Sequence, residues 1–247
     1  MKELRFFYTP QPQSGELPQD EAQHAVRVLR LGTGDELNLM DGDGKFYRAE
    51  ITTATGHRCL YRILEEEQQE RAWKGRIHLA MSPTKLNDRI EWFAEKATEI
   101  GIDEFSFLDC QFSERRVLKS DRIDKIVVSA AKQSHKAWKP IVNEMTAFRK
   151  FVTQERAGQK FICHCYNQED IDGDSIQAQT AKPHLKDVVL PDEECIVLIG
   201  PEGDFSVEEV RLAQANGFQS VTLGTSRLRT ETAGLVAVHI MQLIKQK

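Results

Sequence analysis

Two short apolar runs near the end of the chain each stop at a glycine, and each is followed by a polar loop and a helical pattern. The runs span residues 195–199 and 220–223. The residues that follow them are Gly200, Pro201, Glu202 and Gly203 after the first run and Gly224 after the second. Short β-branched runs predict buried strands of a parallel sheet. Open α/β sheets bind ligands at the carboxyl ends of their strands, so we expect the two junctions to form two walls of one pocket.

The residues after each junction predict a helix. Ser206 and Glu209 have the spacing of a capping box, which places a helix start at Ser206 and its end near Gly217. After the second junction, residues 230–244 predict a helix that is apolar on nearly all sides, as in a buried helix or a subunit interface. Taken alone, the first segment also fits an ordinary strand-to-helix turn, and Arg229 in the second also fits a solvated loop with salt bridges.

Taken together, these segments resemble the signature of the SPOUT class of S-adenosylmethionine-dependent RNA methyltransferases. Within that class the sequence is most similar to the RsmE family, which methylates N3 of a uridine in small-subunit ribosomal RNA. The segments that carry the resemblance are 198–203, 223–224 and 228–233, with 24–31, 34–35, 41–44, Lys85, 95–101 and 131–134 further upstream. The chain departs from the family pattern at Asp204, where a second glycine is usual, at His135, where arginine is usual, and at the pair Arg227-Leu228, where isoleucine-leucine is common. Asp adopts positive φ less readily than glycine, which counts against a left-handed backbone at Asp204, although Asp tolerates that conformation better than most residues.

The pattern along the chain predicts an α/β protein with two domains, 1–72 and 73–247, joined by a polar run at 65–71. Expected strands are 4–8, 36–41, 46–53 and 60–64 in the first domain and 77–81, 104–108 and 161–166 in the second, where 87–100 and 120–134 are expected helices. Short strands predict a small β-barrel, and the resemblance implies that it is a PUA-like RNA-binding domain. Alternating strands and helices predict a parallel sheet with helices on both faces. Residues 173–192 lack periodicity and predict a loop or an irregular insertion.

General folding rules and the family resemblance predict different chain topologies for the C-terminal domain. Folded chains are essentially never knotted, which predicts an unknotted domain. The resemblance implies a deep trefoil knot at the C-terminal end, whose loops form the cofactor site.

Composition limits the function. The 247 residues carry a net charge of −5, which argues against general nucleic-acid binding, although basic residues gather in 113–140. The sequence has no apolar run of about 18 residues and no apolar leader, which predicts a cytoplasmic protein without a membrane span. Its five cysteines lie in strand-like runs, which predicts buried, reduced thiols. Cys163, His164 and Cys165 suggest a metal, but no second ligand pair follows at zinc spacing, so no metal is expected.

The resemblance assigns an S-adenosyl-L-methionine pocket and a reaction. The pocket residues are Leu198, Gly200, Pro201, Glu202, Gly203, Leu223, Gly224 and Leu228. Methylation of uracil N3 requires removal of the imide proton and stabilisation of charge on O2 or O4, and Arg229 is the candidate for that stabilisation. Glu202 or Glu231 is the candidate proton acceptor, although each also fits a salt bridge or a helix N-terminal charge.

The expected substrate is a uridine in the decoding region of 16S ribosomal RNA, within the small subunit, and the expected assembly is a homodimer. Candidate RNA-binding residues are Arg5, Arg27, Arg30, Lys85, Arg115, Arg116, Lys132 and Gln133. Arg27 and Arg30 would share one face of a helical turn. Two alternatives stay open: a SPOUT methyltransferase for another RNA or position, and a non-catalytic RNA-binding module. Both phosphate-binding glycine motifs are missing, and Arg227-Leu228-Arg229-Thr230 replaces the serine-leucine-asparagine stretch usual in ribose methyltransferases.

Overall fold

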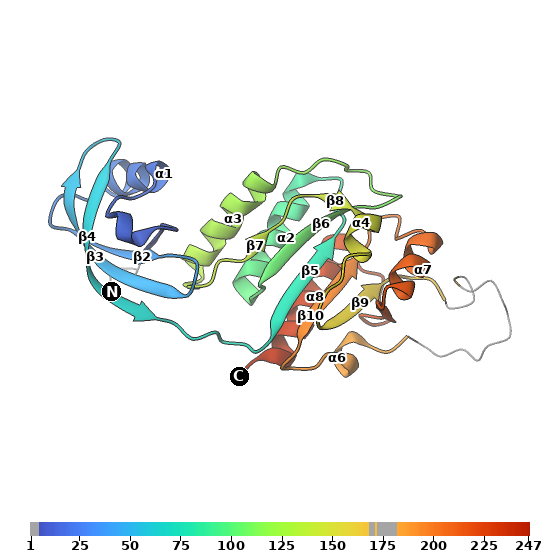
Figure 1. Ribbon diagram of the computed structural model, residues 1–247. Helices are drawn as coiled ribbons and strands as arrows, with labels where there is room; N and C mark the ends of the chain where they lie inside the picture. Colours follow the sequence, from blue (N-terminus) through green and yellow to red (C-terminus); the bar gives the residue numbers. More distant parts are fainter. Residues whose placement is uncertain (1–4, 168–170, 172–181) are drawn as a thin grey trace. The chain divides into compact units, whose positions relative to one another are not determined.

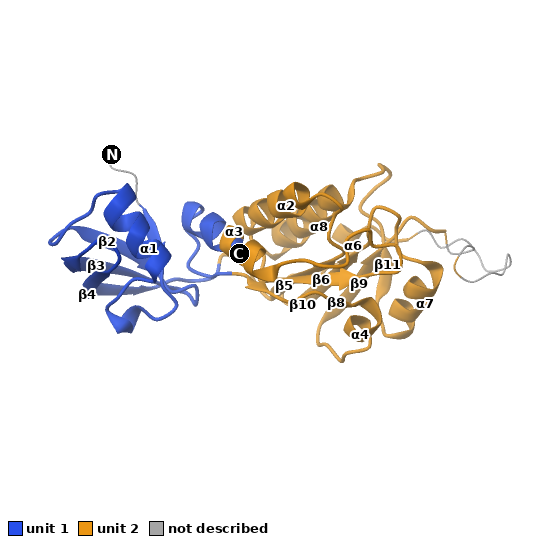
Figure 2. Ribbon diagram, turned by 90° about the horizontal axis from the view of Figure 1, so that it is seen from above, with its two compact units in different colours: residues 1–71, 127–139 blue, residues 72–126, 140–247 orange. Residues whose placement is uncertain are grey.

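The computed structural model describes residues 5–167, 171 and 182–247. The chain divides into two compact units, which Figure 2 shows in different colours. Unit 1 comprises residues 1–71 and 127–139, and unit 2 comprises 72–126 and 140–247. Residues 127–139 therefore group with the N-terminal unit, although they follow in sequence a long stretch of unit 2. The domain limits 1–72 and 73–247 stay a prediction.

Unit 1 is built on a four-stranded sheet with the order β1-β2-β3-β4. Its elements are β1 (Phe6–Tyr8), η1 (Pro12–Ser14), α1 (Gln19–Gln23), η2 (His24–Val28), β2 (Glu36–Met40), β3 (Lys45–Ala54) and β4 (Cys59–Gln68). β1 pairs in parallel with β2, and the other two ladders are antiparallel. One face of the sheet buries an apolar cluster that includes Leu37, Leu39 and Ile51. A small N-terminal β-unit is thus present, and closure into a barrel stays a prediction.

The predicted linker at 65–71 is wrong for its first four residues, which belong to β4. Lys45 pairs with Gln68 across the β3–β4 ladder. Lys45 Nζ lies 2.5 Å from Glu66, and Arg48 lies 3.2 Å from Glu65. The run is polar because it forms an exposed strand whose acidic side chains face basic ones on β3, an arrangement that favours the pairing. Composition alone did not separate such a strand from a linker.

The predicted helical face shared by Arg27 and Arg30 is also wrong. Residues 24–28 form a π-helical turn rather than an α-helix, and Arg30 follows it with a φ of 57°. A π-turn changes the angular spacing of side chains, so positions three apart no longer superpose. Arg27 instead donates to the carbonyl of Gly56 at 2.9 Å and contacts His57.

Unit 2 contains a parallel sheet with the strand order β11-β9-β10-β5-β6-β7, and β8 pairs with β6. The strands are β5 (Arg76–Met81), β6 (Glu104–Asp109), β7 (Ile141–Val142), β8 (Thr146–Ala147), β9 (Gln159–Cys163), β10 (Glu194–Ile199) and β11 (Gln219–Val221). The helices are α2 (Asn87–Ile100), α3 (Ser120–Gln133, which continues into unit 1), α4 (Phe148–Val152), α6 (Leu185–Val188), α7 (Val207–Ala215) and α8 (Thr230–Lys245). The predicted α/β class is confirmed, with β9 and β11 shorter than expected.

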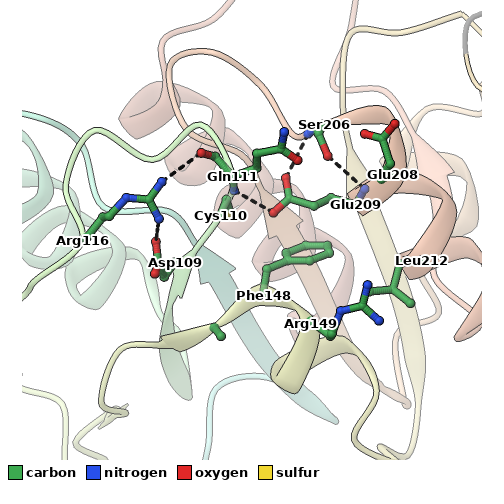
Figure 3. A pocket seen from close by; sticks show the side chains of 11 residues that line it. Asp109, Cys110, Gln111, Arg116, Phe148, Arg149, Ser206, Glu208, Glu209 and Leu212 are labelled. Carbon is green, nitrogen blue, oxygen red and sulfur yellow. Dashed lines mark hydrogen bonds and ion pairs between the residues drawn. The ribbon is translucent and has the colours of Figure 1, made fainter.

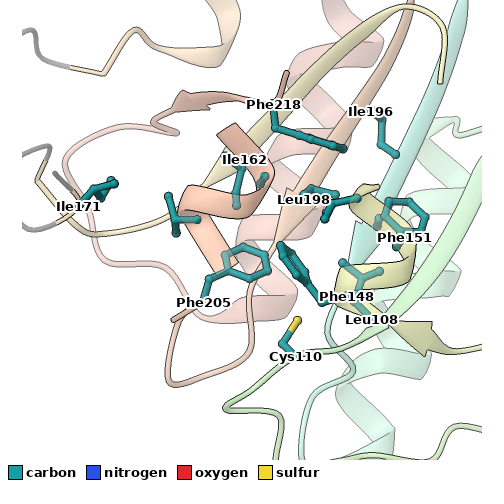
Figure 4. Close-up of a cluster of buried hydrophobic side chains, with 14 residues drawn as sticks. Leu108, Cys110, Phe148, Phe151, Ile162, Ile171, Ile196, Leu198, Phe205 and Phe218 are labelled. Atoms are coloured by element: carbon teal, nitrogen blue, oxygen red, sulfur yellow. The ribbon is translucent and has the colours of Figure 1, made fainter. Parts of the chain in front are cut away.

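Helices cover both faces of this sheet (Figures 1 and 2), with α2 and α8 on one face and α4 and α7 on the other. On the α4 and α7 face, Phe148, Phe205 and Leu198 belong to one buried cluster (Figure 4). On the opposite face, the rings of Phe93 and Phe105 meet edge to face at 5.8 Å. A Cβ on Gly234 would lie only 3.0 Å from Phe93, so this glycine lets α8 pack close to α2.

The described part of the predicted insertion at 173–192 is ordered around α6, and residues 173–181 lie outside the described residues. His184 pairs with Thr222 as an isolated parallel bridge, and Leu185 N donates to Thr222 O at 2.9 Å. This segment therefore runs beside the end of β11. Among the described residues, no helix is both long and apolar enough to cross a membrane.

Candidate functional site

The two glycine junctions lie at the same edge of the parallel sheet, with β9 between them. Cys163 at the end of β9 is in register with Ile199 of β10 and with Val221 of β11, and Ile199 is in register with Met81 of β5. The loops that leave β5, β9, β10 and β11 therefore start level with one another. The sequence predicted the two outer walls and missed the loop of β9 that separates them.

Asp204 adopts a left-handed conformation, which aspartate tolerates better than most residues other than glycine. Its φ is 68°, and its backbone N–H donates to Pro201 O at 2.9 Å, which closes a tight turn. The carboxylate accepts from its neighbour Phe205 N and from Cys165 N, each at 2.8 Å. These two bonds offset the conformational cost, and the second one ties the β10 loop to the β9 loop. A glycine at this position would have no side chain to make that connection.

Gly200, Glu202 and Gly203 have different roles in the β10 loop. Glu202 is exposed, and its Oε1 accepts from the backbone N–H of Lys85 at 2.9 Å, which joins this loop to the β5 loop. A Cβ on Gly200 would lie 3.0 Å from Phe205 N, so this glycine is required by backbone packing. Gly203 is exposed, and its α-carbon borders Phe112.

The backbone at Gly224 in the β11 loop has free space beside it, whereas the backbone at Gly200 in the β10 loop is tightly packed. Gly224 has a φ of 125°, and no heavy atom lies within 4 Å of the position of a Cβ. Its N–H and C=O both bond to the hydroxyl of Thr222, which fixes the turn. Leu223 and Leu228 are half-buried, whereas Leu198 is fully buried in the cluster beneath α4 and α7. Close approach of a ligand to the backbone is therefore easier at Gly224 than at Gly200.

His164, at the end of β9, is a site residue that sequence reasoning considered only as a metal ligand. Its Nε2 lies 2.8 Å from Ser220 Oγ, and its Nδ1 is buried without a hydrogen-bond partner among the described residues. Burial, followed by the nearby Lys182 ammonium, lowers the pKa of this imidazole to about 4. Lys182 donates to the carbonyls of His164 and Tyr166. His164 is thus neutral at pH 7, and its buried Nδ1 is not hydrogen-bonded by any described residue.

The prediction of buried thiols fails at Cys165, and Cys163 is only half-buried. All five cysteines are free, Cys59, Cys110 and Cys195 are buried, and Cys165 is exposed. The reason is that β9 ends at Cys163, so Cys165 lies in the loop rather than in a strand. Across the described residues, no three His, Cys, Asp or Glu side chains come together as a metal site.

The charged candidates near α8 lie at its first turn. Arg229 is the exposed N-cap residue, and its guanidinium makes no hydrogen bond or ion pair with any residue that the structure describes. Glu231 is buried, with Oε1 3.5 Å from Arg89 and Oε2 without a partner in the described chain. A free cation and an incompletely satisfied buried carboxylate are therefore two residues apart at the start of this helix.

The candidate RNA-binding residues are divided between the units, and several are already engaged. In unit 1, Lys132 pairs with Glu21 at 2.6 Å, while Arg5, Arg27, Arg30 and Gln133 are exposed. In unit 2, the pairs are Lys85 with Glu114 at 2.7 Å and Arg116 with Asp109 at 2.6 Å, and Arg115 donates to the carbonyls of Thr84 and Lys85. Lys85, Arg116 and Lys132 thus already face a carboxylate, which reduces the charge they offer to phosphate.

A pocket of about 310 Å³ adjoins the start of α7 (Figure 3). Its wall contains the capping box, in which Ser206 and Glu209 bond each other's backbone, and Glu209 also accepts from Gln111 N at 2.8 Å. Arg116, Arg149, Asp109, Glu208 and Glu209 also line it. None of the eight predicted cofactor residues lines this pocket, which therefore marks a different place from the junction loops.

Two protein-family models match most of the chain. The RNA methyltransferase domain family matches residues 71–242, and the RNA methyltransferase PUA domain family matches residues 17–64. The class is thus an RNA methyltransferase that carries a PUA domain. The chain belongs to the RNA methyltransferase family that includes ribosomal RNA small subunit methyltransferase E.

Individual relatives cover nearly the whole chain. The Synechocystis ribosomal RNA small subunit methyltransferase E is 30% identical over 223 residues, which are 88% of this chain and 69% of the relative. A probable rRNA-methyltransferase from Porphyromonas gingivalis has 38% identity and a TM-score of 0.87, with 98% of both chains covered. Ribosomal RNA small subunit methyltransferase E from Neisseria gonorrhoeae, crystallised with S-adenosyl methionine, has 28% identity and a TM-score of 0.82, again over 98% of both.

Proposed function

We propose that this protein transfers a methyl group from S-adenosyl-L-methionine to N3 of a uridine in the decoding region of 16S ribosomal RNA, in the cytoplasm. The observation that carries the proposal is the register of β9, β10 and β11, whose carboxyl ends lie side by side. This register brings two glycine turns and the neutral His164 to one edge of the sheet. Family membership supports the chemistry, and the Neisseria relative crystallised with S-adenosyl methionine supports the cofactor.

The cofactor pocket is proposed to be lined by the predicted residues of the two junctions. They are Leu198, Gly200, Pro201, Glu202, Gly203, Leu223, Gly224 and Leu228. The residues fit such a ligand in two respects. The surroundings of Gly224 are open to a close approach, and the buried Nδ1 of His164 lacks a partner within the described chain. Buried polar atoms normally find a partner, so a polar group of the cofactor would satisfy this nitrogen. The bound sulfonium supplies an electrophilic methyl group.

The protein's own residues then handle the proton and the charge of the uracil imide. Arg229 is proposed to stabilise the negative charge that develops on O2 or O4, because its guanidinium is free of other partners in the described structure. Glu202 keeps one oxygen on the Lys85 amide and stays exposed, whereas Glu231 is buried beside Arg89. Both remain candidate proton acceptors. Comparing the pH–rate profiles of Glu202→Gln and Glu231→Gln separates them, because only loss of the acceptor removes the acidic limb.

The RNA is proposed to contact the exposed Arg5, Arg27 and Arg30 of unit 1 and the cations of the 113–140 segment. Lys85 and Gln133 are proposed as further RNA contacts. Arg27 keeps its charge while its position is fixed by Gly56 and His57, and no carboxylate pairs with it in the described chain. Removing its charge should weaken RNA binding and flatten its salt dependence without changing cofactor affinity.

The proposed assembly is a homodimer in which α2 and α8 form the contact. These helices lie side by side (Figures 1 and 2), and their outer surface leaves Leu243, Trp92 and the adjacent Leu86 exposed by 61%, 44% and 53%. We propose that these exposed apolar side chains belong to an interaction surface along the two helices, and a two-fold axis would bury them against a second copy of the chain. Light scattering should give twice the chain mass of 28.2 kDa.

The trefoil knot is also part of the proposal. It is supported by the pairing of His184 and Leu185 with Thr222, which holds the chain before β10 beside the chain that leads into α8. An experimental structure in which residues 222–230 do not pass through the loop closed by the preceding segments would contradict it.

The direct test is methyl transfer with purified protein. Titration calorimetry should show S-adenosyl-L-methionine binding, and digestion of treated small subunits should yield 3-methyluridine. Cofactor binding without any methylated product would contradict the proposed activity and favour the alternative of a non-catalytic module. A methylated ribose, or another methylated base, would place the enzyme in a different branch of the class.

A further inference from the structure

The connection between β6 and α3 is held in place more firmly than an ordinary surface loop. The buried hydroxyls of Ser82 and Ser113 lie 2.8 Å apart, and Ser113 Oγ also accepts from Cys110 N at 2.9 Å. Gln111 N donates to Glu209 Oε1 at 2.8 Å (Figure 3). The start of this loop is thus bonded both to the end of β5 and to the cap of α7.

The arginines that follow fix the other side of the same loop. Arg115 donates from Nε to Thr84 O at 3.1 Å and from Nη2 to Lys85 O at 2.5 Å. Arg116 donates to Asp109 Oδ1 at 2.6 Å and to Gln111 O at 3.0 Å. A guanidinium that bonds two groups at once restrains its own backbone, so the segment is preorganised on both sides of Phe112.

Phe112 lies at the centre of this restrained segment, and it is 45% exposed. A Cβ placed on Gly203 would lie 3.3 Å from Cβ of Phe112, so the ring starts directly beside the β10 loop. Single exposed apolar side chains are common on proteins. An aromatic ring held by a fixed backbone next to a loop proposed to bind a cofactor is a more specific arrangement, because its position does not have to be organised when a ligand arrives.

We propose that Phe112 stacks on the face of the target uracil and holds the base for methyl transfer. This inference rests on the proposed function. A base must leave its stack before its Watson–Crick edge can react, and an aromatic side chain can replace the lost stacking. The reacting lone pair of the deprotonated N3 lies in the plane of the ring. A contact on the flat face therefore holds the base while N3 stays free to meet the methyl group.

The contact between Gly203 and Phe112 provides a second variant for the test. A methyl group at Gly203 would lie 3.3 Å from Cβ of Phe112, so Phe112 would have to shift by a few tenths of an ångström. Gly203→Ala should therefore raise the KM for RNA by displacing the ring, and its effect should be much smaller when Phe112 has already been replaced by alanine.

The test compares the full-length protein with Phe112→Ala, Phe112→Leu and Phe112→Tyr, using small subunits from cells that lack the modification and counting 3-methyluridine formed. Loss of one stacked base should lower kcat/KM for RNA roughly 5- to 150-fold in the alanine variant. Leucine preserves apolar bulk without a flat face and should also fail, whereas tyrosine should restore activity to within about threefold of wild type. The Kd for S-adenosyl-L-methionine should stay unchanged in all three.

Val117 provides the matched control, because it is 74% exposed in the same connection and has no ring. Val117→Ala should methylate like the wild type. If Phe112→Leu equals wild type, or if the Phe112 variants lose cofactor affinity as much as RNA turnover, the stacking role is wrong. If the wild type itself forms no 3-methyluridine, the proposed function falls and this inference falls with it. An active wild type with active Phe112 variants removes this inference alone.

Discussion

At the scale of single residues, Arg229 is the side chain on which the proposed chemistry depends most. Arg229→Ala should lower kcat about 100- to 1,000-fold, the usual cost of losing one preorganised group that stabilises developing charge. Its exposed position at the N-cap of α8 means that cofactor affinity and folding should change little. Arg227→Ala is the matched control, because Arg227 is an exposed cation in the same loop. Equal turnover in Arg229→Ala and the wild type would show that this charge is not used.

Gly200 and Gly203 should respond differently to the same small substitution. Gly200→Ala should lower the free energy of unfolding by about 1–3 kcal/mol, because the new methyl group would meet Phe205 N at 3.0 Å and main-chain atoms cannot move aside easily. Gly203→Ala meets only a side chain at 3.3 Å and should cost less. Urea denaturation of both variants measures the difference. Equal stabilities would mean that the β10 loop is more adaptable than its packing indicates.

At the scale of secondary-structure elements, two buried neutral histidines, one within β5 and one directly after β9, make stability depend on pH. Burial, more than any other cause, lowers the pKa of both His78 and His164 to about 4. Unfolded histidine titrates near 6.5, so between pH 6.5 and pH 4 the unfolded chain binds more protons and the folded state loses stability. Each histidine should remove about 2 kcal/mol of unfolding free energy between pH 7 and pH 5.

His164→Gln should flatten this pH dependence, because glutamine keeps a polar group near Ser220 and does not titrate. The measurement is the midpoint of chemical denaturation at pH 7 and at pH 5, compared with His78→Gln. The decisive quantity is the change in the denaturation midpoint between pH 7 and pH 5. The midpoint at a single pH is less informative, because each substitution also alters packing. A wild-type slope in both variants would mean that these histidines are charged or exposed in the folded protein.

Local patterns predicted the elements well where a chain segment determines its own structure. The helix 87–100 and the capping box at Ser206 are confirmed, because periodicity and caps are properties of neighbouring residues. The extension of β4 to Gln68 depends on partners on β3, and the π-turn at 24–28 depends on tertiary packing. The place of His164 between the two junctions follows from the strand order, which no local pattern contains.

At the scale of the whole molecule, the outer surface of α8 is the feature that predicts assembly. Leu243 is 61% exposed on the last turns of this helix. Leu243→Glu should leave the fold intact and shift the protein from dimer to monomer, because a carboxylate would be desolvated in an apolar contact. Sedimentation or light scattering at micromolar concentration reads the result. A dimer that survives both Leu243→Glu and Trp92→Glu would place the contact elsewhere.

The central claim is tested most directly by the ribosomal RNA of cells that lack this protein. Mass spectrometry of nucleosides from their small subunits should show that 3-methyluridine is missing. The wild-type gene should restore it, and the Arg229→Ala variant should not. Persistence of 3-methyluridine at the wild-type level without the protein would contradict the proposed function, whatever the affinity of the junction loops for S-adenosyl-L-methionine.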